Sequence, residues 1–124
     1  MATLTAQLKA DVSGITSDPI SIDKSFTYTA VSGGVTSRSI DTNSAAGEKI
    51  LEADEYATGT IVYLRNREAK GGIVITIQLS AAVGGEIILQ GGEWAMFPWT
   101  TLVDVLAFSA SGAPILEVGV FSAA

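Results

Sequence analysis

The sequence predicts an all-β fold, an antiparallel β-sandwich or jelly roll of about eight short strands with no substantial helix. Apolar and polar side chains alternate with a period of two in several segments, which is typical of half-buried strands. Glycine pairs and prolines separate these segments at close intervals, as turns require. The one stretch with helical character is too short to form a stable helix.

The first predicted strand covers residues 3–12, where leucine, alanine and valine fall on one face and polar side chains on the other. Residues 25–30 alternate again. The Ser-Gly-Gly run at 32–34 predicts a turn, followed by a weaker, serine-rich strand at 35–41. We therefore expect two short strands joined by a turn in this second region.

The middle of the chain is polar and acidic. Residues 42–48 predict a loop, and residues 49–58 contain the helical turn. A hard cation such as Ca²⁺ favours clustered carboxylates, but the spacing of a calcium loop is absent here. We interpret the cluster as a solvated loop and expect no metal site. Its members are Glu48, Glu52, Asp54 and Glu55.

The second half is richer in β-branched and aromatic residues, which favour strands. A glycine-containing polar loop at 66–72 and a turn at 81–85 separate the first three strands. Pro98 is expected to end the fourth. The predicted strands are 60–65, 73–79, 86–89, 93–97, 102–108 and 115–121.

Length and charge limit the functions that this chain can have. The 124 residues predict one domain, 1–124, with residues 1–12 as a candidate edge strand or interaction arm. A net charge of −6 excludes a nucleic-acid partner on electrostatic grounds. No apolar run approaches the roughly 18 residues of a membrane-spanning helix, so we expect no membrane partner. Only 16% of residues are charged, which favours a surface buried in a homo-oligomer.

The missing residue types argue against an enzyme. The chain has no histidine and no cysteine, the usual general base, metal ligand and thiol nucleophile. Gly-x-Ser-x-Gly does not occur to supply a serine nucleophile, and the lysines that could act as its base lie in polar surroundings typical of an exposed surface. Glu93 beside Trp94 has the character of a glycosidase carboxyl against an aromatic wall, but no second carboxylate is identified for it. We expect no catalytic activity and no cofactor.

Aromatic and arginine side chains are the candidate contact residues. Aromatic rings dominate both cores and interfaces, so the aromatic residues of the segment 94–99 are expected in one or the other. The arginines at the strand end near 66 either bind carboxylates of a neighbouring subunit or pair with Glu68. The candidate interface residues are Trp94, Phe97, Trp99, Arg65, Arg67 and Tyr63.

Two motifs and the strand between them resemble a pattern found in a known class of proteins. Tyr63-Leu64-Arg65-Asn66 ends one strand, 73–79 is an isoleucine-rich strand, and Leu89-Gln90-Gly91-Gly92-Glu93 leads into an aromatic strand. This third of the chain resembles small all-β virion structural proteins of tailed bacteriophages. They carry Tyr-x-Arg-Asn or Tyr-x-Lys-Asn at the first position, and Leu-x-Pro-Gly-Glu or Leu-x-x-Gly-Glu at the second. Here Gln90-Gly91 stands where proline is common.

The resemblance implies a capsid decoration (cement) protein, made in the host cytoplasm and placed on the capsid surface of the virion. Its partner would be the major capsid protein, which it would clamp as a homo-oligomer such as a trimer. A tail adaptor or fibre-base subunit is an alternative within the virion. A carbohydrate-binding module is an alternative of another class, with Trp94, Trp99 and Tyr63 as a stacking platform.

Overall fold

The computed structural model describes residues 2–14, 20–40, 48–56, 59–79, 86–99 and 103–123, and these contain nine strands and no helix. The all-β prediction is confirmed. Within these residues no helix is long and apolar enough to cross a membrane. The strands are β1 (Ala2–Val12), β2 (Ile20–Ser39), β3 (Glu48–Leu51), β4 (Thr60–Asn66), β5 (Ile75–Leu79), β6 (Glu86–Leu89), β7 (Trp94–Trp99), β8 (Val105–Ser109) and β9 (Ile115–Ala123).

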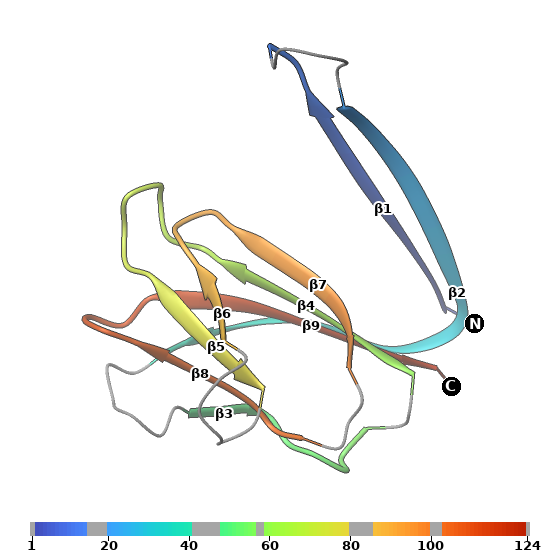
Figure 1. The fold of residues 1–124 in the computed structure, drawn as a ribbon. Helices are drawn as coiled ribbons and strands as arrows, with labels where there is room; N and C mark the ends of the chain where they lie inside the picture. Colours follow the sequence, from blue (N-terminus) through green and yellow to red (C-terminus); the bar gives the residue numbers. More distant parts are fainter. Residues whose placement is uncertain are drawn as a thin grey trace.

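Two antiparallel sheets pack face to face as a β-sandwich (Figure 1). The five-stranded sheet has the order β1-β2-β9-β4-β7 and the four-stranded sheet the order β3-β8-β5-β6. Apolar side chains from alternate positions of both sheets form the core between them, as the period of two requires. The fully buried large side chains include Ile40, Val62, Leu64, Ile75, Ile77, Val105 and Leu116.

Strand β2 corrects the prediction of two strands and a turn. It runs unbroken from Ile20 to Ser39 and changes partner at Val31, pairing with β1 before that residue and with β9 after it. Ala30 is the extra residue of a bulge in the β1–β2 pairing, and bulges bend a strand. Gly33 follows with a φ of 132°, a backbone conformation that favours glycine. The Ser-Gly-Gly run therefore bends a strand instead of ending it.

Other boundaries also differ from the prediction. Residues 48–51 form strand β3 where the end of a loop and the start of the segment with the helical turn were expected, because they pair with β8. Strand β7 continues through Pro98, which is tolerated because β7 lies at the edge of its sheet. Strands β5 and β8 begin later than predicted, at Ile75 and Val105. The predicted turn at 81–85 and the loop over 42–47 lie outside the described residues.

Asn66 ties the two sheets together at the end of β4. Its side-chain amide donates hydrogen bonds to the carbonyl oxygens of Ile73 at 2.8 Å and Leu89 at 2.9 Å. Its carbonyl oxygen accepts from the backbone N–H of Glu68 at 3.0 Å. Asn66 is fully buried, so these bonds replace the water contacts that its amide loses on folding.

Candidate interaction surface

The hairpin of β1 and β2 is an amphipathic ribbon. Residues opposite each other in register share a face, and Ala6 lies opposite Phe26 on the apolar face. The odd-numbered positions from 3 to 11 and from 21 to 29 carry only polar side chains, which form the other face. The predicted alternation of residues 3–12 is therefore present, and β2 continues it.

The apolar face of this hairpin is open to solvent. Figure 1 shows the hairpin extending away from the two packed sheets. None of its described side chains belongs to the core cluster, although Ala6 is buried. A contiguous set of exposed apolar side chains is the usual mark of an interaction site. The exposed fractions are 48% for Leu8, 37% for Val12, 38% for Ile22 and 44% for Phe26.

Hydrogen bonds across the polar face hold the two strands in register. The Gln7 side-chain amide donates to the Asp23 carboxylate at 2.9 Å. The Ser21 hydroxyl donates to the Asp11 carboxylate at 2.8 Å. These cross-strand pairs add to the backbone ladder, so the ribbon presents its apolar face in a defined geometry.

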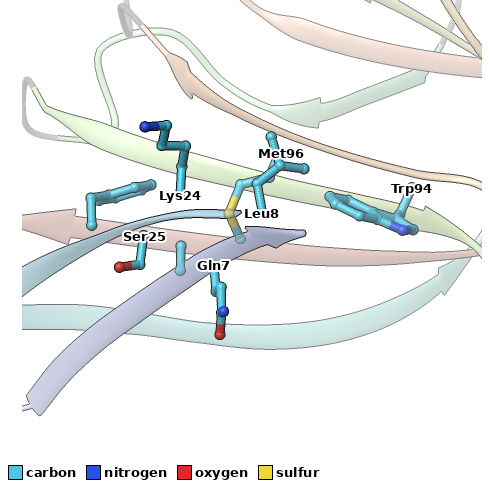
Figure 2. Close-up of a pocket in the computed structure, with 8 residues that line it drawn as sticks. Gln7, Leu8, Lys24, Ser25, Trp94 and Met96 are labelled. Carbon is cyan, nitrogen blue, oxygen red and sulfur yellow. The ribbon is translucent and has the colours of Figure 1, made fainter. Parts of the chain in front are cut away.

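An apolar groove of about 300 Å³ lies between the hairpin and β7. Figure 2 shows Leu8 from the hairpin close to Met96 of β7, with Trp94 beside them. Phe26 completes the hairpin wall, and 53% of Trp94 remains exposed. The groove is open on one side and lined almost entirely by apolar atoms, so it suits an apolar occupant.

A second, more polar groove of about 560 Å³ adjoins the first. Thr5 and Gln7 of β1 form one wall, and Tyr63 and Arg65 of β4 line the other together with Trp94. Together the two grooves separate β1 from the outer face of β4 and β7. The space beside β1 is therefore open along the middle of that strand.

The three aromatic residues of β7 lie in different environments. Trp94 lies on the outer face and lines both grooves. Phe97 is half-buried and packs against the core. Trp99 is 4% exposed, donates its indole N–H to the Val103 carbonyl at 3.0 Å and packs edge-on against Tyr56. Trp99 is thus a core residue, so the expected surface platform of Trp94, Trp99 and Tyr63 does not form.

The candidate arginines and Tyr63 meet at Glu117 of β9. The Tyr63 hydroxyl donates to the Glu117 carboxylate at 2.9 Å, and the Arg67 guanidinium donates to it at 3.0 Å. Arg67 therefore pairs with Glu117 and not with the expected Glu68. Arg65 lies opposite both Glu117 and Trp94 in register. The hydrogen bond from Tyr63 lowers the pKa of Glu117, and Arg67 lowers it further.

This carboxylate predicts a pH-dependent part of the stability. A pKa that is lower in the folded than in the unfolded chain stabilises the fold above the unfolded value, near 4.5, and that contribution is lost as the pH falls through the folded value. We expect urea unfolding to show a smaller loss of stability below pH 4.5 in Glu117→Gln than in the native chain. Equal losses in both proteins would contradict this assignment. Glu86→Gln, at an exposed carboxyl, is the control.

Two of the acidic residues of 48–55 form local ion pairs. Glu48 pairs with Arg38, and Glu52 lies 3.5 Å from the Lys49 ammonium. Asp104 accepts a 2.7 Å hydrogen bond from the Ala53 N–H, which is the main cause of its lowered pKa. Within the described part of the chain, no group of three or more acidic side chains is arranged to hold a metal ion.

Glu93 has a structural role in the turn between β6 and β7. Its carboxylate accepts a hydrogen bond from the Gln90 N–H at 2.7 Å, and its own N–H donates to the Gln90 carbonyl at 2.9 Å. Gly92 donates to the Asn66 carbonyl at 3.0 Å, which joins this turn to β4. The motif that begins at Leu89 therefore forms a turn tied to Asn66.

Sequence reasoning predicted an edge strand or arm at residues 1–12 but missed that residues 20–30 pair with it as a projecting hairpin. Its signal was present in the matching alternation of 3–12 and 25–30, which makes an amphipathic ribbon when the two segments pair. A scan against protein-family models, a search of curated proteins and a search of solved structures found no match to this chain.

Proposed function

We propose that this chain is a non-enzymatic structural protein of a tailed-phage virion, a capsid decoration protein that binds the major capsid protein. The β1–β2 hairpin is its docking arm. The observation that carries the binding role is the exposed apolar face of that hairpin. The assignment to a virion comes from the resemblance of residues 60–99 to small phage structural proteins.

The hairpin suits a docking role for a physical reason. A two-stranded ribbon is marginal in water unless another surface covers its apolar face. Here the side chains of Leu8, Ile22 and Phe26 stay at least one-third exposed in the isolated chain. Covering them against a shell subunit contributes about 25 cal/mol for each Å² of apolar surface removed from water, before association costs are subtracted.

The body of the protein suits a rigid mount for the arm. Asn66 joins the sheets, and within the described residues every buried side-chain polar atom has a hydrogen-bond partner. Negative net charge keeps a free subunit soluble before assembly. The sandwich then holds the arm in one orientation, and repeated copies reinforce neighbouring shell subunits.

Leu8→Ser tests the arm directly. We expect roughly tenfold weaker binding to shells of the major capsid protein, because the variant removes most of one apolar contact. Binding is measured by co-sedimentation with shells purified from the phage that encodes the chain. Ile88→Ser is the matched control, since Ile88 is 58% exposed on β6, away from the hairpin.

The two variants separate the arm from general surface hydrophobicity. Both residues are largely exposed, so both variants are expected to keep the thermal unfolding midpoint of the native chain. Equal loss of binding in both would contradict a docking role for the hairpin. If the native chain fails to bind shells, the decoration proposal is overturned.

A carbohydrate-binding module is a second candidate, and the exposure of Trp94 beside an apolar groove favours it. Sugar rings stack on exposed indole rings, and Met96 extends the apolar surface. Tryptophan fluorescence titrated with a broad glycan panel tests this function. A saturable change that Trp94→Ala abolishes would support it, and no response would contradict it.

A further inference from the structure

Among the described residues, strand β1 is an outer edge of the five-stranded sheet, with β2 paired on one side only. It has 11 residues, contains neither proline nor glycine, and lies at the end of the five-stranded sheet. The opposite edge of that sheet is β7, with six residues that include Pro98. The edges of the other sheet, β3 and β6, have four residues each. None of these three edges matches β1 in length.

The outer side of β2 is a second free edge of the hairpin, and a charged side chain on it disfavours pairing with another strand. Residues 20–30 of β2 pair with β1 on one side, while β9 pairs only with residues 31–39. Lys24 lies on the apolar face in the middle of that free stretch, opposite Leu8. A lysine on the apolar face disfavours addition of another strand. The apolar positions of β1 carry no charge, so β1 is the unprotected edge.

An open groove borders the middle of β1. The groove of about 560 Å³ runs past Thr5 and Gln7. The apolar side chains of a strand added to β1 would lie on the same side as Ala6 and Leu8. Those two residues line the other groove with Trp94 and Met96. An added strand with the alternation of β1 would thus cover the exposed Trp94 ring.

We propose that β1 of a second copy is that strand, paired antiparallel with β1 about a two-fold axis at Gln7. In this register all residues from Ala2 to Val12 find a partner, because residue i faces residue 14 − i. Apolar positions face apolar positions and polar face polar, since the shift is even. Registers centred at Lys9 or Asp11 are excluded because they place like charges opposite each other.

Pairing about a two-fold axis has a consequence for assembly. An isologous contact closes after two copies, so the unit is a dimer and not the trimer expected from the sequence. The two five-stranded sheets then join through their β1 edges into one continuous sheet. Backbone hydrogen bonds along β1 supply the contact, and burial of Trp94 and Met96 adds apolar area.

Cysteine cross-linking tests this register. The chain has no cysteine, so Gln7→Cys introduces a single thiol where two copies face each other. Opposite residues in antiparallel strands have Cβ atoms about 4.5–5.5 Å apart, close to disulfide geometry. We expect mild oxidation to convert Gln7→Cys largely into a disulfide-linked dimer. Thr27→Cys, exposed on the same polar face but on β2, is the matched control and is expected to stay largely monomeric under denaturing conditions.

Light scattering of the native full chain completes the test, with an expected mass of twice 12.8 kDa. A monomeric or trimeric native chain would overturn the inference, and so would faster cross-linking through Thr27 than through Gln7. The inference does not rest on the proposed function. A dimer that ignores capsid shells would keep it and remove the decoration role, whereas a monomer that binds shells would do the reverse.

Discussion

Replacing Gly33 with alanine is expected to lower the free energy of unfolding by about 3 kcal/mol or more. A Cβ atom at this position would lie 1.8 Å from the Val120 carbonyl oxygen, which is backbone and cannot move aside without breaking the β2–β9 pairing. The φ of 132° adds strain for any side chain. Gly33 therefore permits the close approach that lets β2 pass from β1 to β9.

Gly34→Ala is the matched control for this substitution. Its added Cβ meets nothing within 4 Å, so we expect a change of at most about 1 kcal/mol in either direction. Urea unfolding of both variants and the native chain measures the difference. If Gly33→Ala is as stable as Gly34→Ala, the backbone bend assigned to Gly33 is wrong.

Asn66→Ala is expected to cost about 3 kcal/mol of stability. The substitution leaves the carbonyls of Ile73 and Leu89 and the N–H of Glu68 without the partner they have in the native chain. Each buried group that loses its partner costs about 1–3 kcal/mol, although some of them will find water at the opened site. The stability is lost where the hydrogen bonds of Asn66 connect the two sheets.

Gln78→Ala is the control for Asn66. Gln78 also uses a side-chain amide, but it donates to the Glu86 carboxylate at 3.1 Å in an exposed pair. We expect a change below about 0.5 kcal/mol there, because water replaces the lost bond. Urea unfolding of the two variants compares a buried amide with an exposed one. Similar small losses in both would show that Asn66 does not hold the sheets together.

The local sequence pattern predicted the strands of this fold well where one face of the strand packs against the core. The β-branched and aromatic residues of 60–65 and 115–121 predicted strands at the observed places, because such residues favour the extended backbone of a packed sheet. The course of β2 was not predicted, since Ser-Gly-Gly is equally typical of a turn and of a bend. Pairing of Gly33 with Phe121, far along the chain, decides between them.

The candidate site was predicted in part. The aromatic run at 94–99 was recognised. The predicted strand ended at Pro98, so the sequence pattern did not predict which side of the sheet Trp99 lies on. Once β7 continues through Pro98, residues 95, 97 and 99 turn toward the core and Trp94 turns outward. Asn66 was noted in a motif, yet its role depends on a carbonyl at Leu89 that local sequence does not place.

The copy number of this chain in particles tests the decoration proposal most directly. Virus particles from the source of this chain would be purified and the chain quantified by mass spectrometry against their major shell protein. We predict a ratio near one copy for each shell subunit. A few copies in each particle would place the chain in the tail or at a vertex and contradict the decoration role, and complete absence from particles would contradict every virion role.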